Sequence, residues 1–242
     1  MRTRISRGLA AALAVSALSL TAACGGGAKD DTKKDGADKP AAGATTSAAP
    51  TSEAPATPLT AAQMKAAALE LKDLPSGWKA STAEDDDTVY KADKPECAAI
   101  ADLMSGKIDG GTEGAEVGFS KGNNDSEVDE AIATFPGTGA ADFTKKIGTA
   151  LESCTGFTTE VEGSKWKLTL TKLPAPQGVE EAYAFGVAIE VAPGMKIEPN
   201  VIVARQGTGV LRFLHLADAA GKKDFDSLSK LATDKFVTAA KG

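Results

Sequence analysis

Two arginines, Arg205 and Arg212, are the residues of this 242-residue chain whose type and spacing best suit ligand chemistry. They flank Gln206–Gly209, a polar, glycine-containing stretch between two apolar segments, which predicts a hairpin. A turn of two or four residues pairs Arg205 with Val210. The same register pairs Arg212 with Val203, so both guanidinium groups emerge on one face, about 7–8 Å apart. Because a guanidinium binds carboxylates and phosphates through parallel N–H donors, the spacing predicts an anion-binding pair.

An alternative is that these arginines form ion pairs with acidic side chains of their own domain. Asp and Glu number 33 against 27 Lys and Arg, so acidic partners are plentiful. Surface pairs of this kind are common and contribute about 0–1 kcal/mol to stability. A turn of three residues would instead separate Arg205 and Arg212 onto opposite faces. If the pair binds an anion, we expect the ligand beside the strand predicted at 182–191, one face of which carries small side chains.

No catalytic constellation is evident. His215 is the only histidine and lies between two leucines, so we interpret it as a partly buried structural imidazole. Ser227-Leu228-Ser229-Lys230 matches Ser-x-x-Lys, but its companion motifs Ser-Asp-Asn and Lys-Thr-Gly are missing, and we attribute the match to chance. Phosphate-binding loops and dinucleotide fingerprints are also absent. We expect no enzyme, no catalytic residues and no cofactor, with a hydrolase as the weaker alternative.

The beginning of the chain predicts export and lipid attachment. Three arginines within the first seven residues precede the uncharged, apolar run Gly8–Leu20, and together they describe a leader at residues 1–23. The run is too short to span a bilayer, which takes about 20 apolar residues. Cys24 follows two alanines, as in a bacterial lipobox, although the leucine lies one position further away than usual. We predict that Cys24 carries lipid and anchors the protein on the extracytoplasmic face of the cell membrane. The alternative is a secretory leader followed by an unmodified cysteine.

The remaining cysteines, Cys97 and Cys154, predict a disulfide. They are the pair left after Cys24 is modified, and an exported protein reaches an oxidising compartment. Closing so long a loop removes about 4 kcal/mol of unfolded-state freedom in the chain-entropy model. A metal site at this pair is the alternative, but His215 as the only histidine leaves too few ligands for a tetrahedral centre. We therefore expect no metal.

Composition divides the mature chain into a tether and one domain. Residues 24–58 lack aromatic residues and large aliphatic residues, so they predict a disordered Ala/Thr/Pro-rich tether, with O-glycosylation left open. Residues 59–242 suffice for a single domain. Loss of the three leader arginines changes the formal charge from −6 to −9. This acidity disfavours nucleic acid and anionic polymers as partners.

Hydrophobic periodicity in residues 59–242 predicts an α+β domain. We expect one twisted, largely antiparallel sheet of about six to seven strands with helices packed against it. Turn residues between consecutive strands favour hairpins, which join antiparallel neighbours. The predicted strands are 115–121, 127–135, 166–171, 182–191, 200–205 and 210–216. The predicted helices follow a capping box at 60–63, begin at Pro95, and span 142–153 and 224–240.

The order of these motifs resembles that of a known family. Leu74-Pro75-Ser76-Gly77-Trp78 and Cys154-Thr155-Gly156-Phe157, each after a helix, recur with a lipobox and a tether in actinobacterial surface lipoproteins. The domain is similar to the extracellular sensor domain of mycobacterial receptor serine/threonine kinases. This resemblance implies an extracellular α+β domain that binds a ligand in a cleft without catalysis. That sensor domain has two disulfides and this sequence retains one cysteine pair, so no ligand-binding residue is transferred.

Together these features predict a membrane-anchored extracytoplasmic lipoprotein that binds or senses a ligand without catalysis. We expect its partners to be the membrane, through the lipid on Cys24, and an unidentified small molecule or envelope protein. A scaffold that binds another envelope protein is the alternative to ligand binding. An exposed apolar patch would favour the scaffold over a small-molecule cleft.

Overall fold

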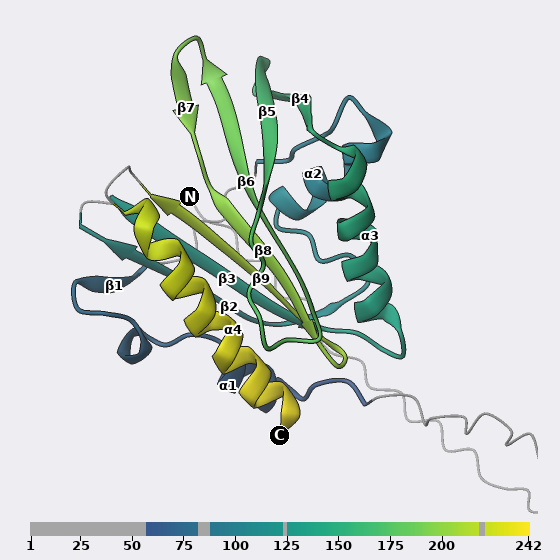
Figure 1. Cartoon of the computed structure of the whole chain (residues 1–242), viewed down its shortest axis with the longest axis vertical. Helices are drawn as coiled ribbons and strands as arrows, with labels where there is room; N and C mark the ends of the chain where they lie inside the picture. Colours follow the sequence, from purple (N-terminus) through teal and green to yellow (C-terminus); the bar gives the residue numbers. More distant parts are fainter. Residues whose placement is uncertain (1–56, 82–87, 123–124, 218–220) are drawn as a thin grey trace, which may run out of the picture. The chain divides into compact units, whose positions relative to one another are not determined.

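The computed structural model describes four stretches of the chain, residues 57–81, 88–122, 125–217 and 221–242 (Figure 1). Cys24, the leader and most of the predicted tether lie outside these stretches, so lipid attachment stays a prediction. The first described residues already contact the sheet, because Thr208 donates a hydrogen bond to the Thr57 carbonyl at 3.1 Å. Leu59 N likewise donates to Thr134 at 2.7 Å. Within the described stretches, no helix is both long and apolar enough to cross a membrane.

One sheet organises the domain. The described strands form a nine-stranded sheet in the order β1-β2-β3-β9-β8-β6-β5-β4, with β7 paired to β6. All of these pairings are antiparallel, which confirms the predicted α+β class and the predicted sheet type. The strands are β1 (Trp78–Ser81), β2 (Thr112–Lys121), β3 (Ser126–Thr134), β4 (Gly156–Val161), β5 (Ser164–Leu173), β6 (Glu181–Ala192), β7 (Met195–Ile197), β8 (Asn200–Gln206) and β9 (Gly209–Ala217).

The predicted number of six to seven strands is wrong, because the described residues form nine. The strands without a counterpart in the prediction are β1, β4 and β7. β1 has four residues, of which only Trp78 is buried, and β7 has three residues that are all exposed. Strands this short show no alternation of apolar and polar residues. In β4 the buried residues are Phe157 and Thr159, so a threonine at an inward position obscures the pattern.

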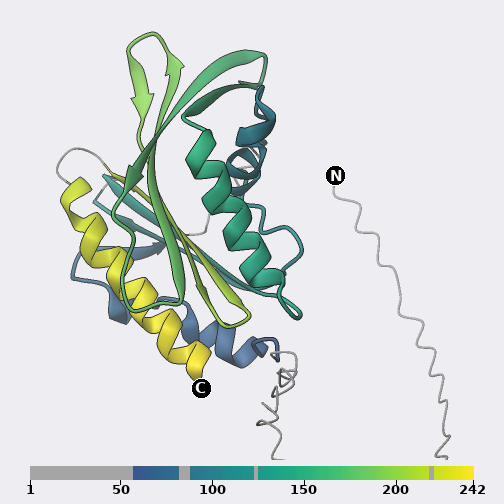
Figure 2. The same cartoon turned by 45° about the vertical axis from the view of Figure 1, so that its right-hand side comes forward.

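Helices cover both faces of the sheet. α1 (Ala61–Ala67) and α4 (Phe225–Lys241) pack on one face, and α2 (Ala98–Met104) and α3 (Gly139–Ser153) lie on the other; Figure 2 shows α4 and α3 on opposite sides. The predicted capping box is present at the start of α1. Gln63 N donates to the Thr60 hydroxyl at 3.2 Å, and Thr60 N donates to the Gln63 side chain at 3.0 Å. Short 3-10 helices lie at η1 (Leu71–Asp73), η2 (Pro95–Cys97) and η3 (Lys222–Asp224).

The two faces of the sheet support two apolar cores. On β8, Val203 points into the core beneath α2 and α3, while the neighbouring Ile202 points into the core beneath α1 and α4. Side chains alternate across a strand, so a strand that is apolar on both faces belongs in the interior of a covered sheet. The β8–β9 hairpin therefore forms the centre of the domain, and it carries Arg205 and Arg212 there.

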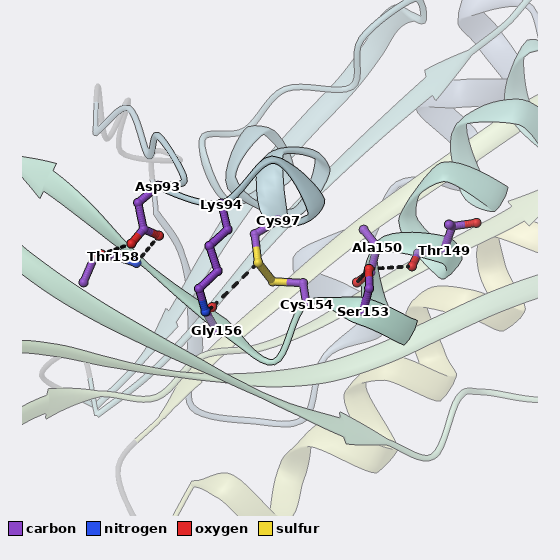
Figure 3. The surroundings of a disulfide bond; sticks show 9 residues. All are labelled: Asp93, Lys94, Cys97, Thr149, Ala150, Ser153, Cys154, Gly156 and Thr158. Atoms are coloured by element: carbon purple, nitrogen blue, oxygen red, sulfur yellow. Dashed lines mark hydrogen bonds between the residues drawn. A yellow bond between two sulfur atoms is a disulfide. The ribbon is translucent and has the colours of Figure 1, made fainter.

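A disulfide joins two segments on the α2–α3 face, as predicted. Cys97 at the end of η2 is bonded to Cys154 just after α3, with their Cα atoms 5.1 Å apart (Figure 3). Nearby, Asp93 accepts hydrogen bonds from both the backbone N–H and the hydroxyl of Thr158 on β4. The disulfide and these hydrogen bonds fasten the segment before α2 to α3 and to the outer strand β4.

Candidate ligand-binding site

The hairpin register predicted for the two arginines is confirmed. β8 and β9 pair Arg205 with Val210 and Val203 with Arg212. Directly opposite residues share a face, so both arginines lie on the face covered by α2 and α3. Their guanidinium groups nevertheless turn toward different strands. Arg205 contacts acids at the start of β6, whereas Arg212 contacts acids of β2 and β3.

Arg205 is engaged by acids of its own domain. Its Nε donates to Glu181 at 3.2 Å and its Nη1 donates to Glu180 at 2.6 Å. Glu181 also accepts hydrogen bonds from Thr144 of α3 at 2.9 Å and from Tyr183 at 3.0 Å. Burial alone would raise the pKa of Glu181, but these hydrogen bonds together outweigh burial and lower that pKa. The network fastens the end of the hairpin to α3. Arg205 is therefore paired with acidic residues of its own domain, and we propose no anion-binding role for it.

Arg212 is buried without being saturated. Its side chain is 7% exposed, and its Nη2 lies 3.7 Å from Asp129 Oδ1 and 4.0 Å from Glu116 Oε1, which is longer than a hydrogen bond. Arg212 Nε and Asp129 Oδ1 are both buried without a hydrogen-bond partner among the described residues. Buried polar atoms in native proteins are almost always hydrogen-bonded. Arg212 Nε and Asp129 Oδ1 are therefore exceptions to this rule within the part of the chain that the structure describes.

A small pocket lies beside Arg212 on the same face. Its volume is about 230 Å³, and it is lined by Gly106 after α2, by Ala131 of β3 and by residues 113–116 of β2. Ala131 lies directly opposite Arg212 on one side and directly opposite Glu116 on the other, so the three residues form a row across the sheet. Glu116 lines the pocket and lies 4.0 Å from Arg212 Nη2, so the guanidinium is near this side of the pocket although Arg212 is not one of its lining residues.

A β-bulge supplies the pocket with two carboxylates. The register of β2 against β3 shifts between Glu113 and Ala115, with Gly114 as the extra residue. In a regular strand, residues three apart face opposite sides of the sheet, but the extra residue brings Glu113 and Glu116 to the same side. Position 114 favours glycine, because a Cβ there would collide with Met64 of α1.

Negative charge predominates around the pocket. Glu113 and Glu116 line it, and Asp129 lies behind them against Arg212. Burial raises the pKa of Asp129, and the nearby Arg212 opposes this rise. The described residues contain no group of three or more His, Cys, Asp and Glu arranged to hold a metal ion. The two carboxylates that line the pocket therefore favour a positively charged group there.

A serine–histidine pair is present, but it is buried away from this pocket. Ser126 Oγ lies 2.9 Å from His215 Nε2, and the two residues are 3% and 1% exposed. His215 Nδ1 has no hydrogen-bond partner within the described stretches. Burial lowers the pKa of His215, and Asp224 opposes that effect. A catalytic triad needs a carboxylate at Nδ1 and an accessible nucleophile, so this geometry supports the predicted structural role of His215.

The sequence predicts that the small-residue face of β6 lies beside the two arginines, and this prediction is wrong. Ala184 on that face belongs to the core beneath α1 and α4, whereas Arg212 lies on the α2–α3 side. Further along β6, Gly186 and Ala188 are half-buried, and a Cβ on Gly186 would come within 3.0 Å of the Asn200 side chain. Alternation fixes the two faces within one strand, but the register between β6 and β8 decides which face of β6 is shared with the arginines, and that face carries Glu181 and Tyr183.

Exposed apolar side chains are scattered. Among the described residues, the exposed large apolar ones are Leu71 in η1, Val89 in a connecting segment, and Met195 and Ile197 on β7. Figures 1 and 2 both show the β6–β7 hairpin extending beyond α3 and α4. Single exposed apolar residues are normal on monomeric proteins, whereas interaction sites expose contiguous patches. This distribution favours the pocket over a protein interface as the functional feature.

Sequence reasoning misses Glu113, Glu116 and Asp129. Two signals in the sequence mark them. Gly114 lies directly before the predicted strand 115–121, and a glycine next to a strand pattern can mark a bulge within a longer strand. Asp129 shares its face of β3 with Ala131 and Ala133, two alanines that the sequence places at alternate positions after it. An acidic residue on a strand of this kind indicates a charge partner on the same face of the sheet.

Comparison with known proteins extends this description at the level of fold. The sequence matches no family model and no curated protein. Among solved structures, the chain is similar to the extracellular domain of PknH from Mycobacterium tuberculosis, with 16% identity and a TM-score of 0.55 over 76% of this chain and 98% of that one. It also matches a Rv0999 ortholog from Mycobacterium smegmatis (13% identity, TM-score 0.43, 75% and 95% covered). A further match is PsbP (CyanoP) from Synechocystis sp. PCC 6803 (11% identity, TM-score 0.34, 79% and 96% covered).

The first of these matches confirms the resemblance noted in the sequence. The similarity covers nearly all of the PknH extracellular domain, so both chains share one overall fold. At 16% identity the likeness establishes the fold and does not transfer binding residues. No argument rests on the two matches with lower TM-scores. This α+β domain has the fold of the extracellular domain of a mycobacterial receptor kinase.

Proposed function

We propose that the protein is a non-enzymatic ligand-binding or sensing lipoprotein, anchored by lipid on Cys24 at the extracytoplasmic face of the cell membrane. The pocket between the end of α2 and the β2 bulge is its ligand site. The observation that carries this proposal is the pair of carboxylates, Glu113 and Glu116, that lines that pocket, with the buried Arg212 4.0 Å from Glu116.

Comparison of the two arginines supports a ligand-binding role for one of them. Arg205 and Arg212 belong to the same hairpin and the same face, yet Arg205 Nε donates to a carboxylate at 3.2 Å while Arg212 Nε has no partner within the described part of the chain. Leaving a buried donor unpaired costs about 1–3 kcal/mol. A ligand acceptor at Arg212 would recover this free energy.

The location proposed for the protein is supported by the leader and by the fold. The sequence up to Cys24 is typical of a lipoprotein leader, and the fold is that of a domain described as extracellular in PknH. The disulfide between Cys97 and Cys154 also fits an oxidising compartment.

A stability screen tests the ligand-binding role. Purified protein is unfolded thermally in the presence of sugars, nucleotides, organic acids, amines and amino acids. A ligand at about 100 times its Kd stabilises the folded state by about 2.7 kcal/mol. A true ligand stabilises the wild type but not a Glu113→Gln, Glu116→Gln double variant, while Glu160→Gln on β4 is the matched control. If every stabilising compound acts equally on all three proteins, the pocket is not a ligand site.

A further inference from the structure

Three ionisable side chains from three elements interact beneath α1 and α4. Glu130 of β3 is fully buried, and the charges of Asp73 of η1 and Lys235 of α4, which form an ion pair, both act on it. We infer that these three residues form a pH-sensitive latch, which holds the connection between α1 and β1 on the sheet and releases it when Glu130 ionises. This inference goes beyond the proposed function and does not depend on the pocket.

The latch segment, residues 69–74, connects α1 to β1 and includes η1. Two polar contacts join it to other elements. Leu69 N donates to Glu130 Oε2 at 2.8 Å, and Asp73 pairs with Lys235. Leu69 and Leu74 are also buried in the core beneath α1 and α4. Both polar contacts therefore depend on a carboxylate, and one lysine acts on both carboxylates.

The closed latch favours the neutral form of Glu130. Its Oε1 is buried without a hydrogen-bond partner in the described stretches, so a negative charge there would lack a donor. Lys235 is already paired with Asp73, and the charge of Asp73 repels an ionised Glu130. Burial outweighs the opposing effects of the Leu69 N–H and Lys235, and it raises the pKa of Glu130 to about 8.

Other charged groups around Glu130 do not replace Lys235. His215 of β9 lies on the same face as Glu130, but burial lowers its pKa and favours the neutral ring. On β2 the residue opposite Glu130 is Val117, which carries no charge. Lys65 of α1 is exposed to solvent. Among the described residues, the two carboxylates of the latch therefore compete for Lys235.

Ionisation of Glu130 weakens both contacts of the latch segment. A buried carboxylate needs a cation or water, so an ionised Glu130 attracts Lys235 away from Asp73 and is hydrated when Leu69 leaves the sheet. A pKa of 4.5 in the open form and about 8 in the closed form makes the ratio of open to closed molecules increase about tenfold per pH unit between these values. Opening exposes Leu69 and Leu74, so pH controls access to apolar surface beneath α1.

Amide hydrogen exchange on the purified full chain tests the latch. The protection factor of Leu69 N–H, which compares its exchange rate with that of an unstructured peptide at the same pH, should fall about 100-fold from pH 5.5 to pH 7.5. Val203 lies on a strand that is paired on both sides, so its amide reports global unfolding. Local opening of the latch predicts that about 1 M urea lowers the protection of Val203 but not that of Leu69.

Two substitutions test the roles of the carboxylates. Glu130→Gln keeps an acceptor for Leu69 N but does not ionise, so the protection of Leu69 should be the same at pH 5.5 and pH 7.5. Asp73→Asn removes the repelling charge and frees Lys235, so the midpoint of the Glu130 titration, followed by carboxyl ¹³C NMR, should fall by about 1 pH unit. Asp234→Asn makes the same chemical change at an exposed position of α4 and should leave this midpoint unchanged.

Three results would overturn the latch. Equal urea dependence of Leu69 and Val203 would mean that the latch segment opens only with the whole domain. A wild-type Leu69 protection factor that does not change between pH 5.5 and pH 7.5 would mean that Glu130 does not control opening. An unchanged Glu130 midpoint in Asp73→Asn would exclude competition for Lys235. The wild-type measurements need no substitution at the buried residue, so they decide the matter even where Glu130→Gln does not fold.

Discussion

Glu130 makes the stability of the domain depend on pH, and Glu130→Gln should remove that dependence. Glu130 lies on β3 with no exposed surface, in the core beneath α1 and α4. Its Oε2 accepts a hydrogen bond from Leu69 N at 2.8 Å, while Oε1 is buried without a partner in the described stretches. Burial raises the pKa of Glu130 from 4.5 to about 8, although the Leu69 N–H and Lys235 oppose the rise.

The sign and size of the effect follow from this pKa. A group whose pKa is raised on folding contributes its full stability below the unfolded pKa, and that contribution is lost as pH rises through the folded pKa. A rise from 4.5 to about 8, at about 1.36 kcal/mol per pH unit, corresponds to about 5 kcal/mol. We expect the wild type to lose about 4 kcal/mol of this contribution between pH 4.5 and pH 8. Glutamine keeps an acceptor for Leu69 N but does not ionise, so its variant loses none.

Urea unfolding at pH 5, 6.5 and 8, with the disulfide intact, measures the difference. The free energy of unfolding of Glu130→Gln should match the wild type within about 1 kcal/mol at pH 5 and exceed it by about 4 kcal/mol at pH 8. Other titrating groups cancel when the two proteins are compared at each pH. Glu160→Gln, at an exposed position of β4, makes the same chemical change and should show no such divergence. A difference between Glu130→Gln and wild type that stays constant from pH 5 to pH 8 would refute a buried, protonated Glu130.

Three further predictions concern the anchor, the disulfide and one glycine. Cys24→Ala should release the protein from the membrane into the medium, because stable anchoring depends on acyl chains at this residue; fractionation with unchanged membrane retention would contradict it. Replacing both Cys97 and Cys154 with alanine should lower the free energy of unfolding by about 4 kcal/mol, measured in urea, and alkylation of the denatured, unreduced wild type should leave both cysteines unmodified. Gly156→Ala should cost about 1–3 kcal/mol, because its Cβ would collide with the backbone carbonyl of Leu168; a midpoint equal to that of the wild type would show that β4 and β5 separate without cost.

The long elements of the fold could be predicted because an element with one buried face shows a periodic pattern of apolar residues in the sequence. The hairpin of β8 and β9 alternates Val203 and Arg205 on one face with Ile202 and Ala204 on the other, and the structure retains this parity. β7 shows no such alternation, because its three residues, which pair with β6, are all exposed. A strand without buried side chains cannot be predicted from the pattern of apolar residues.

Short motifs in the sequence prove to be structural. Gly77 in the turn before β1 has a φ of 98°, a conformation that favours glycine, and the following Trp78 is buried in the α1–α4 core. In the second motif, Cys154 forms the disulfide and Phe157 belongs to the α2–α3 core. Both motifs therefore mark points where the chain turns and enters a core, which explains why they accompany the fold without identifying a ligand.

The site could be predicted only in part, because parity fixes the face of a side chain and not its partner. The register places Arg205 and Arg212 on one face, as expected for a turn of two or four residues, but each guanidinium has a neighbouring strand on either side with which it can pair. Arg205 pairs with β6 because Glu181 is directly opposite it there. On β8 the residue opposite Arg212 is Val203, which cannot pair with a charge. The guanidinium of Arg212 therefore points toward β3 and β2, where it approaches Asp129 and Glu116. The order of strands in the sheet decides this outcome, and local sequence does not specify that order. Arg212 consequently meets carboxylates at 3.7 and 4.0 Å, which is longer than a hydrogen bond, and spacing along the hairpin alone does not predict this arrangement.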